Sequence, residues 1–361
     1  MSRKWHINGR FLTQPVTGVQ RYAHEILQAL DRHLAGGHSL AEDLQLELVV
    51  PGRSPEVPAL RAVRVRPVGR SGGHGWEQTV LPSVARSRLL SLCNTGPVMV
   101  RNHIVCIHDV NTRACPASYS PAFRALYRCL LPALGRTAGK VATVSNHSAD
   151  QLVRYGIAAR DNLMIVPNGH EHALRWRPDH SPATRAAAGR DTIVIIGSPA
   201  PHKNVRLIVD LAPRLAAVGL RVAVAGLTDG RVFRTDQARP VAENVLWLGR
   251  LADNELAALL RDSLCLAFPS LAEGFGLPAL EAMTLHCPVV ASDQASLPEV
   301  CGDAALYASP FDGDAWLACF LRLREEASLR EHLSARGRLR AAGYSWMKSA
   351  EAYLRAMAAA P

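Results

Sequence analysis

The chain has 361 residues, 48% of them hydrophobic, and a formal net charge of +10 at pH 7. This length suits two ordinary domains with substantial cores, and no segment approaches the roughly 20 apolar residues of a helix that spans a membrane. The basic residues lack interleaved aromatic side chains, which disfavours a protein that binds nucleic acid.

The first half of the chain alternates short apolar runs with helical patterns. Strands are predicted over residues 5–8, 44–50, 105–108 and 141–144, and a helix over residues 20–30. This alternation predicts a parallel sheet with helices on both of its faces.

A basic amphipathic helix is predicted over residues 121–141, where apolar residues recur at helical spacing among arginines. The first 180 residues carry 22 Lys and Arg against 12 Asp and Glu, whereas the remainder carries 19 of each. Contact with an anionic membrane surface is one hypothesis for this half. The alternative is that the apolar stripe of the helix packs on the protein's own core.

The second half repeats the alternation after a break. A turn at residues 167–169 and a stretch at 176–190 rich in Pro, Arg and Ala place the domain boundary near residue 180. Strands follow at 192–197, 220–225, 245–248, 264–268 and 288–292, with helices at 205–218 and 254–261. We therefore predict one domain over residues 1–180, a second over 181–343, and an amphipathic helix over 344–361.

The strand at 264–268 leads into a glycine-rich loop. This loop begins at Glu273, Pro278 has the fixed φ that suits the first turn of a helix, and Glu281 follows eight residues after Glu273. Glycines let the backbone approach a ligand closely, and the amides that begin a helix favour an anion such as pyrophosphate. Glu273 and Glu281 can accept hydrogen bonds from sugar and ribose hydroxyls.

The segment from Glu273 to Glu281, written around Gly-Phe-Gly-Leu, resembles the signature of the retaining, GT-B-type family 4 glycosyltransferases, and the likeness covers most of the chain. It implies an α/β fold of two Rossmann-like, doubly wound domains that face a central cleft, with the C-terminal helix crossing back to the first domain. It also implies transfer of a hexose from a nucleotide sugar with retention of configuration, without a metal and without a cofactor.

Three residues are the candidates for catalysis. Lys203 matches the lysine with which this family neutralises the departing diphosphate, His108 matches a histidine that contacts the transferred sugar, and Glu273 opens the signature. A solvated lysine and a structural histidine are the competing interpretations. The residues expected to bind the donor are Gly18, Lys203, Arg250, Leu251, Glu273, Gly274, Phe275, Gly276, Leu277 and Glu281.

The chain departs from the family pattern at Ser198, where an arginine that binds phosphate is common. We therefore look for a second cation among His202, Arg206 and Arg250.

Residues 108–155 most resemble the bacterial mannosyltransferases that build surface polysaccharides, including lipopolysaccharide. This resemblance suggests GDP-mannose as the donor and a polyprenyl-diphosphate-linked glycan as the acceptor. A UDP-sugar or another GDP-sugar as donor, a nucleotide-sugar epimerase or hydrolase, and a non-catalytic scaffold that binds sugar nucleotides remain the alternatives.

The location is inferred from the first residues and from the cysteines. The N-terminal residues hold no apolar stretch long enough for a signal peptide, so we expect a cytoplasmic protein, peripheral at the inner membrane if the basic helix binds lipid. The eight cysteines include no C-x-x-C pair, so we expect reduced core residues without a metal site or a disulfide.

Overall fold

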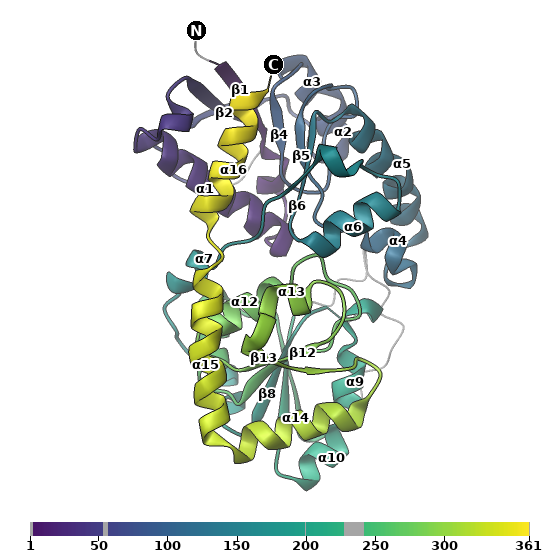
Figure 1. Ribbon diagram of the computed structural model, residues 1–361, viewed down its shortest axis with the longest axis vertical. Helices are drawn as coiled ribbons and strands as arrows, with labels where there is room; N and C mark the ends of the chain where they lie inside the picture. Colours follow the sequence, from purple (N-terminus) through teal and green to yellow (C-terminus); the bar gives the residue numbers. More distant parts are fainter. Residues whose placement is uncertain (1–2, 53–56, 199, 227–241, 361) are drawn as a thin grey trace. The chain divides into compact units, whose positions relative to one another are not determined.

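The computed structural model describes residues 3–52, 57–198, 200–226 and 242–360, which form two compact units (Figure 1). The first unit comprises the described residues up to Val110, residues Leu126–Gly169 and the segment from Ser345 onward. The second unit comprises residues Asn111–Ala125 and His170–Tyr344.

The chain returns to the second unit at His170, before the boundary predicted near residue 180. The reason lies in the backbone after that point. The N–H of Arg177 donates to Asn254 Oδ1 at 2.9 Å, and the N–H of Asp179 donates to the carbonyl of Asn254 at 3.1 Å. The stretch predicted as a link between domains is therefore packed against the second unit.

The first unit is built on a seven-stranded sheet in the order β3-β2-β1-β4-β5-β6-β7, and every strand pair is parallel. The four predicted strands are confirmed, whereas β3, β4 and β7 were missed. The strands β3 and β7 are edge strands with exposed or half-buried residues, and β4 is a buried run of three residues. The strands are β1 (Arg3–Asn8), β2 (Leu44–Pro51), β3 (Arg64–Val68), β4 (Leu89–Ser91), β5 (Ile104–Cys106), β6 (Lys140–Thr143) and β7 (Leu163–Ile165).

Helices of the first unit include α1, which matches the predicted helix over residues 20–30, and α16, which matches the predicted C-terminal helix. The helical segments are η1 (Gly9–Thr13), α1 (Gly18–Ala35), η2 (Ser39–Ala41), α2 (Gly73–Thr79), α3 (Leu81–Val84), α6 (Asn146–Arg154), η4 (Arg160–Asn162) and α16 (Trp346–Ala359). The helix α5 (Pro121–Thr137) begins in the residues of the second unit and continues in the first.

The C-terminal helix α16 packs on α1, as the yellow and purple helices of Figure 1 show. The hydroxyls of Tyr22 and Tyr353 lie 2.8 Å apart in the interior, and Ser349 Oγ donates to the carbonyl of Pro167 at 2.6 Å. The C-terminal segment therefore completes the core of the first unit.

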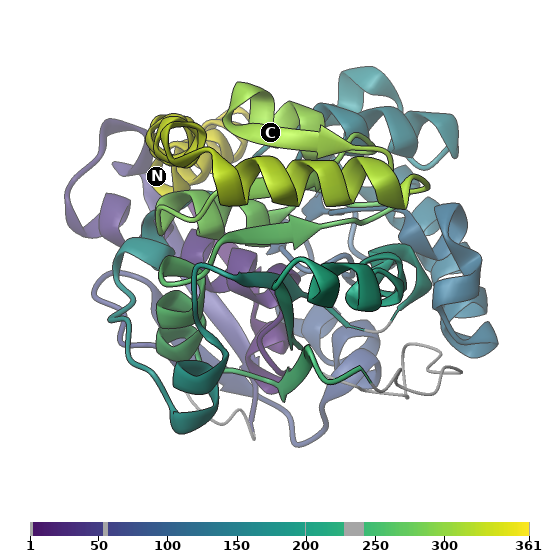
Figure 2. The same ribbon diagram turned by 90° about the horizontal axis from the view of Figure 1, so that it is seen from below.

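The second unit is built on a six-stranded parallel sheet in the order β10-β9-β8-β11-β12-β13, with helices on both sides of the strands (Figure 2). All five predicted strands are confirmed. The strands are β8 (Thr192–Ile196), β9 (Arg221–Ala225), β10 (Val245–Gly249), β11 (Cys265–Phe268), β12 (Val289–Ser292) and β13 (Ala305–Ala308).

The helix predicted over residues 205–218 is divided in two. The second piece begins with Pro213 in its first turn, and because proline lacks the N–H that a continuous helix needs, the first piece ends just before it. The helical segments of the second unit are α4 (Asn111–Ala114), η3 (Pro116–Ser118), α7 (Glu171–Leu174), α8 (Pro182–Ala187), η5 (Pro201–Lys203), α9 (Val205–Asp210), α10 (Ala212–Ala217), α11 (Asp253–Arg261), α12 (Leu277–Thr284), α13 (Leu297–Cys301), η6 (Gly302–Ala304), α14 (Gly313–Glu325) and α15 (Ala327–Ala342).

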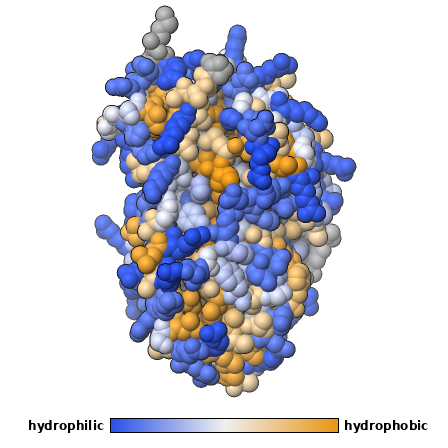
Figure 3. Space-filling model, viewed as in Figure 1, coloured by the Kyte–Doolittle hydropathy of each residue, from blue (hydrophilic) through white to orange (hydrophobic). Residues whose placement is uncertain are grey.

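The structure agrees with the absence of a long apolar segment from the sequence. Among the described residues, no helix combines the length and the apolar character that crossing a membrane requires. Charged and polar residues cover most of the face shown in Figure 3, with smaller apolar patches among them.

Candidate functional site

The strand order of the second unit fixes where a ligand can bind. The chain order reverses between β8 and β11, which are adjacent and parallel. In open parallel sheets, ligands bind at such a reversal, beside the carboxyl ends of the strands. The loop after β8 carries Lys203 and the loop after β11 carries Glu273, so two of the three predicted catalytic residues lie at this point.

The two loops are joined by an ion pair and by the backbone. Lys203 Nζ lies 2.6 Å from Glu273 Oε1 and 5.9 Å from the centre of the Phe268 ring. The lysine side chain is 23% exposed and the glutamate side chain 9% exposed. The N–H of Leu271 donates to the carbonyl of His202 at 2.8 Å. A half-buried cation and a buried carboxylate therefore share one edge of the sheet.

Gly276 makes the turn from this loop into α12. Its φ of +103° lies in the region that favours glycine, and a Cβ there would come within 2.7 Å of Leu297 Cδ2 and 3.3 Å of the Phe268 ring. Pro278 stands in the first turn of α12, as predicted, and Glu281 is the fifth residue of that helix.

Ser296, which the sequence analysis did not single out, orients the backbone of the loop. Its fully buried hydroxyl lies 3.1 Å from the Glu273 carbonyl and 2.9 Å from the Phe275 carbonyl, and donates to them. All peptide bonds of the described chain are trans, so each amide points opposite to the carbonyl that shares its peptide plane. The N–H groups of Gly274 and Gly276 therefore point away from Ser296.

Glu281 has a partner that the sequence did not reveal. His172 Nε2 lies 2.9 Å from Glu281 Oε1, and both residues are buried. No motif surrounds His172. Ser296, in contrast, follows strand β12 at the carboxyl edge of the sheet, which is a signal that could have found it.

The other predicted donor residues lie near this loop or on separate elements. Phe275 and Leu277 are buried, and the Phe275 ring meets the Tyr344 ring edge-on at 5.3 Å. Gly274 is buried beside them. Leu251 is half-buried in the loop after β10, and Gly18 is the first residue of α1 in the first unit.

The three candidates for a second cation differ in charge and in surroundings. Burial, with a smaller effect of the Lys203 charge, lowers the pKa of His202 to about 4, so this imidazole is neutral at pH 7. Arg206 pairs with Asp210 at 3.1 Å on the surface of α9. Arg250 is exposed after β10. His202 therefore carries no charge at neutral pH in the ligand-free protein.

His108 belongs to the first unit, where it follows β5. Its Nε2 lies 2.8 Å from the Leu92 carbonyl, and its ring meets the Tyr22 ring edge-on at 4.7 Å. Because a carbonyl only accepts, Nε2 carries the proton and Nδ1 can accept a hydrogen bond. Burial lowers the pKa of His108 to about 4, so the ring is neutral at pH 7.

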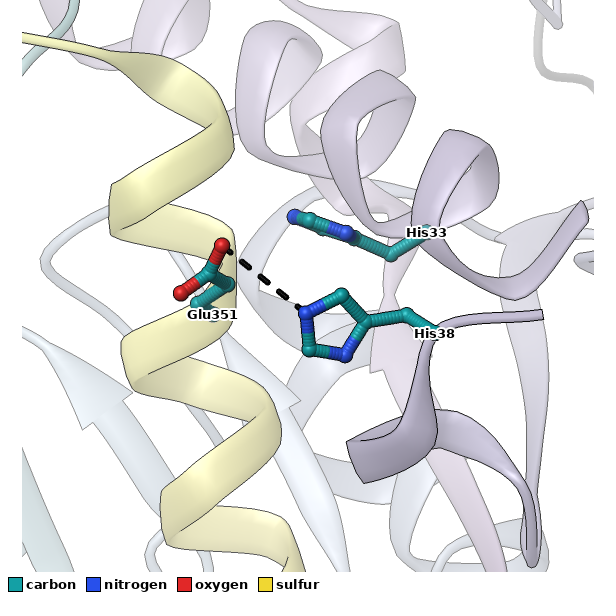
Figure 4. A group of neighbouring side chains, drawn as sticks. All are labelled: His33, His38 and Glu351. Carbon is teal, nitrogen blue, oxygen red and sulfur yellow. Dashed lines mark ion pairs between the residues drawn. The ribbon is translucent and has the colours of Figure 1, made fainter. Parts of the chain in front are cut away.

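One group of side chains in the described structure has the composition of a metal site. His33, His38 and Glu351 have potential ligand atoms within 4.8 Å of one another, at the contact of α1 with α16 (Figure 4). His33 Nε2 lies 3.0 Å from the Met347 carbonyl, and His38 Nδ1 accepts from the N–H of Leu40 at 3.3 Å. The neutral His38 ring then keeps its proton on Nε2, the atom that faces Glu351 at 3.8 Å. This protonation pattern fits a helix contact better than a metal centre.

Comparison with known proteins adds to this geometry. A model of the family described as "Glycosyl transferases group 1" matches residues 177–340. The O-antigen chain mannosyltransferase B of Escherichia coli is 30% identical over 269 residues, 69% of this chain and 68% of that protein. The O-antigen chain mannosyltransferase RfbU of Salmonella typhimurium is 24% identical over 248 residues, 68% of this chain and 67% of that protein.

Solved structures share the fold. A sucrose-phosphate synthase from Thermosynechococcus elongatus has a TM-score of 0.69 at 15% identity, and 97% of each chain is covered. WaaG, described as a glycosyltransferase involved in lipopolysaccharide biosynthesis, has a TM-score of 0.67 at 16% identity, and 98% of each chain is covered. The predicted GT-B fold of two Rossmann-like domains is therefore confirmed.

Proposed function

This chain belongs to the glycosyl transferases group 1, and from that premise we propose that it is a retaining, metal-independent family 4 enzyme that transfers mannose from GDP-mannose. The acceptor is a lipid-linked or polysaccharide glycan of the bacterial surface. The names of the E. coli and Salmonella relatives support the choice of mannose. The observation that carries the proposal is the Lys203–Glu273 pair at the reversal of strand order in the second unit.

Stabilisation of the leaving group is the main chemical task, because a nucleotide sugar already carries its diphosphate. Lys203 supplies a positive charge, and the N–H of Gly276, which points away from Ser296, supplies a further donor to the diphosphate oxygens. The bond between the anomeric carbon and the diphosphate oxygen breaks as the acceptor hydroxyl attacks the same face. The acceptor proton passes to the departing phosphate.

Recognition of the sugar falls to acceptor groups. Glu273 accepts from hydroxyls of the hexose through the oxygen that Lys203 does not hold, and Glu281 accepts from the ribose. Neutral His108 acts as an acceptor toward a sugar hydroxyl rather than as an acid, because its Nε2 proton is committed to the Leu92 carbonyl.

Membrane contact forms part of the proposal. The beginning of α5 is exposed, with Arg124 and Arg128 on the surface and Leu126 44% exposed. Farther along the helix, Leu130 and Leu134 are buried in the core of the first unit. Only the exposed part of this helix is therefore available to an anionic lipid surface.

A transfer assay tests the proposal. The protein is incubated with GDP-mannose and a polyprenyl-diphosphate-linked acceptor, and the products are separated and analysed by NMR. A transferase yields a mannosylated lipid with the anomeric configuration of the donor. Free mannose would indicate a hydrolase, an altered nucleotide sugar an epimerase, and turnover of UDP-sugars alone would refute the choice of donor.

A further inference from the structure

Glu281 is held by a residue outside the glycine-rich loop. It lies in α12, its side chain is 9% exposed, and its Oε1 is 2.9 Å from His172 Nε2. A carboxylate can only accept, so the imidazole donates this hydrogen bond through its Nε2 proton. The bond fixes which carboxylate oxygen is used inside the protein.

His172 is itself fixed by its surroundings. It lies in α7, which packs against α12 within the second unit, and its side chain is 1% exposed (Figure 1). Its ring meets the Trp176 ring edge-on at 5.4 Å and an interplanar angle of 81°. Because the ring cannot rotate without disturbing this packing, the direction of Nε2 is set before any ligand binds.

We infer that His172 is a positioning residue, which holds Glu281 so that its second oxygen is presented to the ribose hydroxyls of the donor nucleotide. This inference rests on the proposed function, since it takes Glu281 as the ribose acceptor. A glutamate without such a partner can rotate among several staggered conformations, and holding it in one lowers the entropy lost when ribose binds.

The alternative is that the bond only joins α7 to α12. The two roles give different results if the ligand is changed together with the protein. A role in presenting Glu281 affects only nucleotides that have ribose hydroxyls, whereas a purely structural role affects all nucleotides alike.

The experiment measures the dissociation constants of GDP and of 2′,3′-dideoxy-GDP by calorimetry, or of the UDP pair if UDP binds more tightly. For the wild-type protein, GDP is expected to bind at least about tenfold more tightly than its dideoxy analogue. H172F and E281Q should each lower this ratio toward one, while the affinity for the dideoxy nucleotide changes by less than about threefold. H172Q should retain most of the ratio, because its amide can place a donor near the position of Nε2.

The matched control is H180Q. His180 Nε2 also lies 2.9 Å from a carboxylate oxygen, that of Asp262, in the same unit but outside the donor loops. This variant should leave the ratio unchanged. If H172F is too unstable to purify, H172N, whose amide is too short to reach Glu281, takes its place.

The outcomes separate the inference from the function on which it rests. A ratio that H172F or H172N leaves at the wild-type value overturns the role of His172, although nucleotide binding itself stands. Equal weakening of both nucleotides also overturns it. If the wild-type protein binds neither GDP nor UDP, the proposed function fails first.

Discussion

Removal of the Ser296 hydroxyl should impair both stability and turnover. The hydroxyl is fully buried and donates to the carbonyls of Glu273 and Phe275. In S296A the protein loses one net hydrogen bond and leaves these carbonyls less well satisfied, which should lower the free energy of unfolding by about 1–3 kcal/mol. The adjacent amides lose their fixed direction, and turnover should fall about 10- to 100-fold, as for loss of a preorganised donor.

The matched control for S296A lies in the loop after β11, whose carbonyls Ser296 binds. Ser270 is also fully buried, but within the described structure its hydroxyl has no hydrogen-bond partner. S270A should therefore change the free energy of unfolding by less than about 0.5 kcal/mol and leave turnover within roughly twofold. Urea denaturation and the transfer assay measure both quantities. Equal effects of the two substitutions, or wild-type turnover in S296A, would refute the argument that Ser296 orients the amides.

Three further predictions follow from single features. G276A should lower the free energy of unfolding by about 2–4 kcal/mol, because φ is positive there and the new Cβ would lie 2.7 Å from Leu297. G75A is the control and should not destabilise the protein, since the space around its Cβ is open. Urea denaturation measures both variants. Acidification from pH 6.5 to 4 should lower the free energy of unfolding by up to about 3 kcal/mol for each of the buried histidines His108 and His202. The reason is that these rings bind protons in the unfolded chain, whereas in the folded protein their pKa values are about 4. A free energy of unfolding that stays constant over this pH range would contradict the prediction. The double variant R124E/R128E should bind anionic vesicles at least about tenfold more weakly in a sedimentation assay, since each charge contributes about 1 kcal/mol. Its binding to neutral vesicles should not change. Unchanged binding to the anionic vesicles would show that α5 does not contact the membrane.

The parts of the fold that the sequence predicted best are those with a strong apolar pattern. The strands β8, β9, β11 and β12 are buried and β10 is a half-buried edge strand, but all five are mainly apolar runs, and α16 has a clear apolar stripe, so local pattern was sufficient for them. The edge strands β3 and β7 lack such patterns, because β3 is mostly exposed and β7 has no buried residue. They exist because neighbouring strands pair with them, which no local window records.

The residues of the candidate site also fall into those that the sequence predicted and those that it could not. The sequence predicted Glu273, Gly276 and Glu281, because two carboxylates spaced around a glycine-rich turn indicate a ligand site. His172 and Ser296 lie 109 and 23 residues from the groups that they bind, so only the folded chain brings them together. Likewise, no spacing in the sequence could show that burial makes His202 neutral.

The central claim is that Lys203 binds a nucleotide diphosphate at the reversal of strand order. Calorimetric titration of the wild-type protein and of K203M with GDP and with guanosine tests it most directly. K203M should weaken GDP binding at least about tenfold, through the loss of one charge-assisted contact, and should leave guanosine binding unchanged. The same affinity for GDP in both proteins would contradict it.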